Sequence, residues 1–219
     1  NKKTKKKISA ILVVHVFGNL VNLKPLISVC KKKKIDIIED AAESFGSYYK
    51  KNYPIKHAGT IGKFGCISFN GNKTITCGGG GVILTQQKKL ANKARYLVSQ
   101  AKNNPIEFVH NDIGFNYKMT NLHAAIGVAQ IENFKKILKK KKEIFETYSN
   151  KISKVKGISM ISNPTYSRSN NWMNLVSINK KEYKKNTKQL IKIFNDNGVQ
   201  VRPVWFLNHL QKPYKNCQN

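Results

Sequence analysis

The sequence predicts an α/β fold with a mainly parallel sheet, and three consecutive segments carry this prediction. Residues 8–14 form a short, continuous apolar run rich in β-branched side chains, which is typical of a buried strand. Residues 23–30 carry apolar side chains at helical spacing, and residues 35–38 form a second apolar strand. A strand, a helix and a strand within about thirty residues make a βαβ unit, whose two strands run parallel.

The ends of these elements carry their own signals. Asn22 is a candidate N-cap for the helix, and Pro25 lies in its first turn. The basic run Lys31–Lys34 complements the negative end of the helix dipole and marks the C-terminus. The second strand ends in Glu39 and Asp40. Because ligands collect at the carboxyl ends of parallel strands, Asp40 falls where a ligand site is expected.

Further strands are predicted at residues 64–69 and 82–85, on either side of the glycine run Gly78–Gly81. From Thr120 onward the apolar residues recur at helical spacing, which predicts one long helix leading out of the first domain.

A second, smaller region follows this helix. Its apolar and helical segments lie at residues 158–161, 175–178, 185–197 and 199–204. We therefore predict a first domain over residues 1–140 and the start of a smaller α+β domain over residues 141–219.

The chain is strongly basic. Among its 219 residues, forty are Lys or Arg and eleven are Asp or Glu, which gives a formal charge of +29. Such a charge suggests a nucleic-acid-binding protein. However, the excess is mostly lysine, and Lys, Asn and Ile share A/T-rich codons, so mutational bias explains it better. A basic protein that binds nucleic acid or another anionic polymer remains an alternative.

Cysteine and histidine spacing predicts no metal site. The four cysteines form no C-x-x-C pair, and free cysteine among apolar neighbours behaves as a small hydrophobe, which fits a reducing cytoplasm. His15, His57, His110 and His123 are interpreted as structural or exposed. No apolar run is long enough to span a bilayer.

Three motifs combine residue types that suit one cofactor. Glu39–Ser44 closes a strand with acids, Ser68–Lys73 places a hydroxyl and a lysine after another strand, and Gly78–Gly81 follows. Pyridoxal phosphate needs a carboxylate for its ring nitrogen, donors for its phosphate and an amine for its aldehyde. Lys73 is the centre of this hypothesis, because it lies between a strand and a glycine turn.

Each of these residues has a plainer interpretation when taken alone. Asp40 could begin the turn after its strand, Ser68 could be an ordinary strand residue, and Asn116 could be a loop residue. The four glycines could form a flexible turn, although glycine also lets backbone approach a cofactor closely.

The motifs together resemble a known family. They are Glu39–Ser47 (EDAAESFGS), Gly59–Gly62 (GTIG), Ser68–Lys73 (SFNGNK), Gly78–Gly81, Gly114–Leu122 (GFNYKMTNL) and Ala124–Gly127 (AAIG). In this order, and over nearly the whole chain, the sequence resembles the DegT/DnrJ/EryC1/StrS family of pyridoxal-phosphate-dependent sugar aminotransferases of fold type I. It most resembles the branch that aminates 4-keto sugar nucleotides on the way to bacillosamine or legionaminic acid.

The resemblance implies a role for each matching position. Lys73 bonds to the cofactor aldehyde and moves the proton during transfer. Asp40 pairs with the pyridine nitrogen, Glu43 lies near the ring hydroxyl, and Ser68 binds the phosphate. Asn116 reaches the phosphate in the neighbouring subunit, which implies a homodimer with shared active sites.

The resemblance also implies the substrates. Arg202, Trp205 and His209 match the segment that faces the sugar nucleotide, although a packed tryptophan and a surface histidine explain two of them equally well. The implied reaction moves an amino group, with glutamate as donor, to a nucleotide-linked keto sugar for surface polysaccharide or glycan synthesis. A sugar 3-dehydratase uses the same cofactor but lacks the lysine, so Lys73 argues against it.

The chain is also expected to be a piece of a longer protein. In the family, an upstream segment supplies a phosphate-binding turn and an aromatic residue that stacks on the cofactor, and we expect both to lie before residue 1. An inactive fragment of such an enzyme is therefore a further alternative.

Overall fold

The computed structural model describes residues 1–50, 56–104 and 106–217. Two compact units make up the chain. The large unit comprises residues Ser9–Glu146 and Ser162–Met173, and the small unit comprises Asn1–Ile8, Thr147–Ile161 and Asn174–Asn219. The domain ranges 1–140 and 141–219 stay a prediction.

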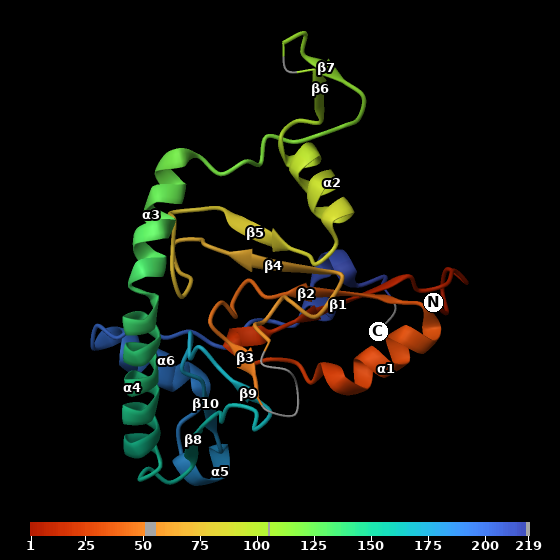
Figure 1. Ribbon diagram of the computed structural model, residues 1–219. Coiled ribbons are helices and arrows are strands. Elements are labelled where there is room, and N and C mark those ends of the chain that lie inside the picture. The colour runs from red at the N-terminus through yellow and green to blue at the C-terminus, as the bar shows by residue number, and fades with distance from the viewer. Residues whose placement is uncertain (51–55, 105, 218–219) are drawn as a thin grey trace. The chain divides into compact units, whose positions relative to one another are not determined.

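The large unit is built on a mainly parallel sheet, as predicted (Figure 1). Its strands lie in the order β1 (Ala10–Val14), β2 (Asp36–Asp40), β4 (Phe64–Ser68) and β5 (Gly81–Leu84). The first three run parallel to their neighbours, and β5 pairs with β4 in the antiparallel direction. The α/β prediction is therefore confirmed.

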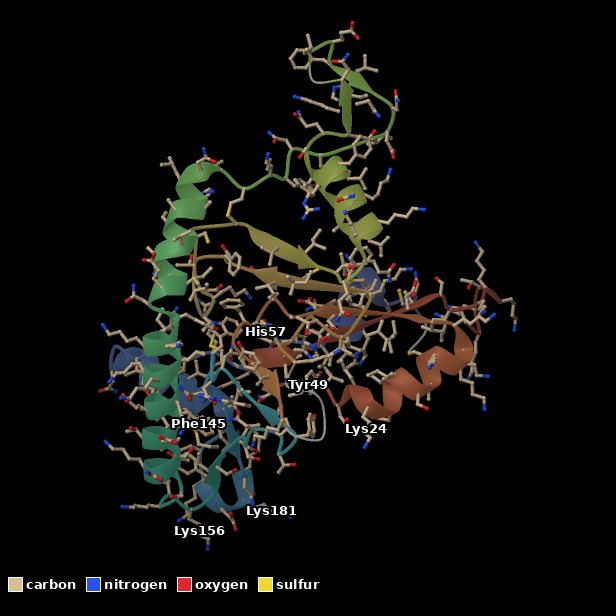
Figure 2. All side chains as sticks on the ribbon, in the orientation of Figure 1. Lys24, Tyr49, His57, Phe145, Lys156 and Lys181 are labelled. Atoms are coloured by element: carbon tan, nitrogen blue, oxygen red, sulfur yellow. The ribbon has the colours of Figure 1, made fainter. Side chains whose placement is uncertain are left out.

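Helix α1 (Leu23–Lys33) connects β1 to β2 and begins and ends at the predicted residues. The Asn22 side chain accepts a hydrogen bond from the backbone N–H of Lys24, which satisfies one of the free donors of the first turn. Lys34 adopts a left-handed conformation (φ 53°) and closes the helix. Figure 2 shows Lys24 on α1, where it is exposed.

One face of the sheet and α1 enclose the core. Its buried side chains include Val13, Leu23, Cys30, Ile37 and Ile67. These residues alternate with others along each strand, so the opposite face carries Asp40, Cys66 and Ser68.

The other elements of the large unit are short or helical. They are η1 (Val16–Gly18), β3 (Tyr48–Tyr49), α2 (Lys88–Val98), β6 (Lys102–Asn104), β7 (Val109–His110), α3 (Asn121–Glu132), the first part of α4 (Phe134–Ile152) and β9 (Ser167–Arg168). Strand β3 pairs with β9, and this pairing brings residues 162–173 back to the large unit.

The small unit contains a two-stranded antiparallel sheet of β8 (Ile158–Met160) and β10 (Val176–Ile178). Its helices are the end of α4, α5 (Lys180–Tyr183), α6 (Thr187–Asp196), η2 (Asn208–Leu210) and η3 (Lys212–Tyr214). Helix α6 begins with a capping box in which Asn186 and Gln189 bond to each other's backbone.

The structure differs from the sequence prediction in two places. The single long helix is two helices, α3 and α4, because Asn133 adopts a non-helical conformation and its side chain donates to the carbonyl of Ala129. The segment 199–204 forms no strand, and Pro203 within it lacks the N–H that a strand ladder requires.

A buried carboxylate joins three parts of the large unit. Glu39, at the end of β2, is fully buried. Its oxygens accept hydrogen bonds from the backbone N–H groups of Gly59 (3.0 Å), Ile61 (2.7 Å) and Gly62 (2.5 Å). The fourth partner is His15 Nε2, at 3.0 Å. The motif Gly59–Gly62 is thus a backbone loop folded around one carboxylate.

The proton positions on His15 follow from its two neighbours. Its Nδ1 accepts a hydrogen bond from the N–H of Val21 (3.1 Å), so its Nε2 carries the hydrogen and donates to Glu39. Burial opposes ionisation of Glu39, but the hydrogen bonds from His15, Gly62 and Ile61 outweigh burial and lower the pKa of Glu39 below its ordinary value of 4.5.

Replacing Glu39 by Gln is expected to lower the free energy of unfolding by about 3 kcal/mol, because an amide NH₂ then faces backbone donors in a buried site. Urea denaturation of both chains measures this loss. Asp36→Asn is the matched control on the same strand, since Asp36 forms an exposed ion pair with Lys63 and its loss should cost about 0–1 kcal/mol. Equal losses in the two variants would contradict the central position of Glu39.

The stability difference between wild type and Glu39→Gln is also expected to depend on pH. Because the folded-state pKa of Glu39 is lowered, its stabilising contribution is complete above pH 4.5 and is lost as the pH falls through the folded-state pKa. The stability difference between wild type and Glu39→Gln should therefore shrink only below pH 4.5, as measured by denaturation from pH 7 downward. A difference that already shrinks between pH 7 and pH 5 would argue against this assignment.

Candidate active site

Asp40 and Ser68 lie on the same face of the sheet, at the ends of neighbouring parallel strands. Asp40 is paired in register with Cys66 of β4, and Ser68 follows Cys66 by two residues. The Asp40 Oδ1 atom accepts a hydrogen bond from the N–H of Ala42 (3.0 Å), which fixes the turn after β2. Asp40 thus does begin a turn, and it also stands at the strand end where a ligand is expected.

Lys73 lies at the tip of a loop that is closed at its base. The N–H of Phe69 donates to the carbonyl of Gly80 (2.9 Å), and the N–H of Cys77 donates to the carbonyl of Phe69 (2.9 Å). A tight turn at the tip brings the N–H of Lys73 to the carbonyl of Asn70 (3.0 Å). Because hydrogen bonds close the base of the loop, they hold the backbone of Lys73 in place.

The glycine run lets helix α3 approach this loop. Gly78 and Gly80 have positive φ angles (81° and 86°), which side chains other than glycine rarely adopt. A Cβ at Gly80 would lie 2.8 Å from the Met119 side chain, and one at Gly127 of α3 would lie 2.8 Å from the sulfur of Cys77. The positive φ therefore favours glycine at position 80, and a side chain at position 127 would force the Cys77 sulfur to shift.

Glu43 faces the lysine. Its Oε1 lies 3.8 Å from Lys73 Nζ, and the exposed fractions of the two side chains are 9% and 15%. The other oxygen accepts a hydrogen bond from the backbone N–H of Phe17 (2.6 Å). Phe17 itself has φ 57°, so a residue in the left-handed region supplies the donor.

Two opposing sets of neighbours set the pKa of Glu43. Burial, together with the negative charge of Asp40, raises this pKa above its ordinary value of 4.5. The Phe17 N–H and the Lys73 ammonium act in the opposite direction but do not cancel the effect of burial. Glu43 therefore keeps its proton to a higher pH than an exposed glutamate does.

The segment Ser169–Trp172 contacts the same loops, and sequence reasoning missed it. Trp172 Nε1 donates a hydrogen bond to the carbonyl of Asn72 (2.7 Å), and Lys73 Nζ lies 4.6 Å from the centre of the Trp172 ring. No local signal marks these residues, because Trp172 and Asn72 are 100 positions apart.

The structure does not place the other predicted site residues in this cluster. Asn116 is exposed and forms an isolated backbone bridge with Ser99. Arg202, Trp205 and His209 belong to the small unit and are exposed. Their roles therefore stay predictions.

His57 supports the loop that carries Glu43. Its Nε2 accepts from the N–H of Gly46 (2.7 Å), so its Nδ1 carries the hydrogen and donates to the carbonyl of Ala58 (2.6 Å). Burial lowers the pKa of His57 below its ordinary value of 6.5, which keeps the ring neutral. Tyr49, labelled beside His57 in Figure 2, is almost fully buried.

No group of three or more His, Cys, Asp or Glu side chains is arranged to hold a metal ion among the residues that the structure describes. Among the helices described, none has the length and apolar character needed to cross a membrane.

Comparison with known sequences gives a consistent set of relatives. EpsN of Bacillus subtilis, described as a pyridoxal-phosphate-dependent aminotransferase, is 32% identical over 202 residues, which are 92% of this chain and 50% of EpsN. A GDP-perosamine synthase of Escherichia coli O157:H7 is 32% identical over 212 residues, which are 97% of this chain and 56% of that protein. The chain thus spans about half the length of these relatives.

Solved structures share the fold. The aminotransferase TlmJ of Streptoalloteichus hindustanus superposes with a TM-score of 0.86 at 23% identity, covering 97% of this chain and 56% of TlmJ. PseC of Helicobacter pylori, an aminotransferase in pseudaminic acid biosynthesis, gives a TM-score of 0.86 at 20% identity, covering 95% of this chain and 56% of PseC. The predicted aminotransferase fold is confirmed.

The family model of the DegT/DnrJ/EryC1/StrS aminotransferases matches residues 1–219. The order of the motifs, the fold and this match agree, and the chain belongs to the DegT/DnrJ/EryC1/StrS aminotransferase family.

Proposed function

We propose that this chain carries the lysine-bearing part of a pyridoxal-phosphate-dependent enzyme that transfers an amino group to a keto group of a nucleotide-linked sugar. One observation carries the proposal. Lys73 is held at the tip of a closed loop, mostly buried, with its amine 3.8 Å from the Glu43 carboxylate. Many other lysines of the chain are exposed, so the partial burial of Lys73 beside a carboxylate supports a chemical role for it.

The residues present fit the cofactor by the chemistry of their donor set. An amine, two acids and a hydroxyl come from Lys73, Asp40, Glu43 and Ser68, at the ends of two neighbouring strands and in the loops that follow them. A Cβ added at Gly71 or Gly79 would meet no atom within 4 Å, so there is open space beside each of these two glycines. Bound pyridoxal phosphate supplies an aldehyde that bonds to amines and a pyridine ring that accepts electrons.

Each of these residues has a distinct proposed task. Asp40 pairs with the ring nitrogen and keeps it protonated, and Ser68 donates its hydroxyl hydrogen to the phosphate. Lys73 would hold the cofactor by condensation of its amine with the aldehyde, with loss of water, and its Nζ atom would carry a proton during the transfer. Glu43 lies beside that amine and is proposed to face the ring hydroxyl.

The identities of the substrates are proposed as well. Relatives named for GDP-perosamine and for a UDP-linked altrosamine support a nucleotide-linked sugar, although they do not single out the bacillosamine or legionaminic-acid branch. We keep that branch, glutamate as amino donor and a role in polysaccharide precursor synthesis in the cytoplasm as proposals. Arg202, Trp205 and His209 are proposed to contact the sugar nucleotide, because a guanidinium suits a diphosphate.

A second copy of the chain is the proposed partner. The region from residue 106 to α3 exposes many apolar side chains of the large unit. They include Ile106, Phe108, Ile113, Phe115, Tyr117, Leu122, Ile126, Val128 and Ile131. An apolar surface of this kind is typical of a protein interface. Asn116 lies within the same region, which supports its proposed contact with the cofactor phosphate of the partner.

Treatment with pyridoxal phosphate and borohydride, followed by peptide mapping, is expected to label Lys73 in preference to the exposed lysines. Lys73→Ala should remove this label and, in the complete enzyme, reduce sugar amination to background, because no other amine stands at that position. Lys63→Ala is the matched control, since the Lys63 side chain is partly exposed and forms an ion pair with Asp36. Sugar amination that survives in Lys73→Ala would exclude the mechanism.

Leu122→Glu should weaken self-association by roughly a hundredfold, because an unpaired carboxylate buried in an interface costs about 3 kcal/mol. Analytical ultracentrifugation over a range of concentrations measures the dissociation constant. The control is Val29→Glu on α1, a residue that is also exposed (56%) but lies outside the apolar region. If the wild-type chain sediments as a monomer at all concentrations, or if both variants behave alike, the proposed dimer surface is wrong.

A further inference from the structure

We propose that Trp172 is a positioning residue for Lys73, and that Asn170 anchors Trp172 in place. The inference rests on the proposed function of Lys73 and deepens it. It comes from the segment Ser169–Trp172, here called the arm, which returns to the large unit after α4.

The arm has a defined local structure. Asn171 takes a left-handed conformation (φ 50°), which asparagine tolerates better than most residues. The Ser169 hydroxyl accepts from the N–H of Asn171 (3.1 Å), and the Asn170 side-chain oxygen accepts from the N–H of Trp172 (3.0 Å). These bonds hold the arm in a tight turn that points the Asn170 and Trp172 side chains in fixed directions.

Asn170 ties the arm to the loop after β2. Its Nδ2 lies within hydrogen-bond distance of the carbonyls of Glu43 (2.8 Å) and Phe45 (3.0 Å), and of Thr74 Oγ1 (3.0 Å). Its backbone N–H donates to the hydroxyl of Ser47 (3.0 Å). One buried amide thus joins the glutamate loop to the residue that follows Lys73.

Gly18 makes this close approach possible. A Cβ at Gly18 would lie 2.0 Å from the Asn170 side-chain oxygen, which no side chain could tolerate. The carbonyl of Gly18 also accepts a hydrogen bond from the Ser47 hydroxyl (2.7 Å). The anchor of the arm is therefore built from three separate segments.

Trp172 acts on the other side of the lysine. Its indole N–H holds the carbonyl of Asn72 (2.7 Å), the residue before Lys73, while its ring lies 4.6 Å from Nζ. The Phe17 ring stacks on the same indole, with centroids 6.5 Å apart and an interplanar angle of 25°. Trp172 is 4% exposed, so its orientation is fixed by packing.

The result is an amine held between two groups. A lysine side chain has four rotatable bonds and would otherwise sample many positions. Here the Glu43 carboxylate and the face of the Trp172 ring both attract a cationic amine. Both neighbours of Lys73 in the chain are held by the arm, which confines the amine to one direction of approach.

A purely structural role predicts a different outcome from a positioning role. If Trp172 only filled the core, its loss would lower stability and leave Lys73 no different from other lysines in the protein that remains folded. If it positions Lys73, its loss changes the behaviour of Lys73 specifically. Tyr166→Phe is the matched control, because the Tyr166 hydroxyl likewise donates to a backbone carbonyl, that of Leu20, but not near Lys73.

The first measurement is the ratio of pyridoxal phosphate–borohydride label on Lys73 to label on Lys89, an exposed lysine of α2. Trp172→Leu, which removes both the ring and the donor, should lower this ratio about tenfold. Trp172→Phe, which keeps a ring, should lower it by only about threefold. Tyr166→Phe should leave the ratio unchanged, and thermal unfolding of each variant confirms that folded protein is compared.

The second measurement needs no cofactor. Lysine amines are methylated with ¹³C-formaldehyde and a mild hydride reductant, and the Lys73 methyl signal is identified by its absence in Lys73→Arg. The ring current of Trp172 should move this signal upfield, and Trp172→Leu should return it to the position of exposed lysines. An unshifted Lys73 signal in the wild-type chain would overturn the proposed contact.

The two readouts separate the possible failures. A shifted methyl signal with no label on Lys73 would overturn the proposed function, and the positioning of a cofactor-bound amine with it, while keeping the contact. A normal label in wild type with an equal ratio in Trp172→Leu and Tyr166→Phe would overturn the positioning role and keep the proposed function.

Discussion

The large unit depends on the burial of one ionised carboxylate. Moving the Glu39 charge out of water carries a penalty that only well-placed donors can offset, and the chain provides three backbone N–H groups and the ring of His15. These donors belong to segments on both sides of β2 in the sequence. Because Glu39 accepts from all of them, it holds His15 and the loop 59–62 at the end of β2. Asp40 is the next residue of this strand. The position of the candidate site thus follows from an interaction outside it.

Backbone groups are also the main partners of polar side chains in the candidate site. Two hydroxyls of the loop after β2 donate to backbone carbonyls, Ser44 to that of His15 and Ser47 to that of Gly18. Backbone partners stay in place when neighbouring side chains change. This arrangement also separates two kinds of charge in a very basic chain. Lysines cover the outside, while the acids Glu39 and Glu43 are buried next to the few cations or donors they need.

Local elements could be read from the sequence, and long-range contacts could not. Apolar periodicity predicts β1, α1 and β2, and the cap at Asn22 and the basic end of α1 are signals written within a few residues of their effect. The split between α3 and α4 was missed because one asparagine side chain decides it. Neither the partner of His15 nor the contact of Trp172 with Lys73 has a local signature, since each joins distant segments. The order of the motifs, rather than apolar periodicity, identified Lys73 as the central residue of the candidate site.

The missing side chain at Gly18 carries a consequence for how related sequences diverge. A side chain at Gly18 would collide with the Asn170 amide, so a substitution of Gly18 requires a change at Asn170 as well. A lineage that gains a side chain at one position must shorten or lose the other, and in doing so releases Trp172 from its place. Descendants of this chain should therefore keep Gly18, Asn170 and Trp172 together or replace all three together. Such correlated substitution among related sequences would reveal the shared contact, even where the rest of both segments differs.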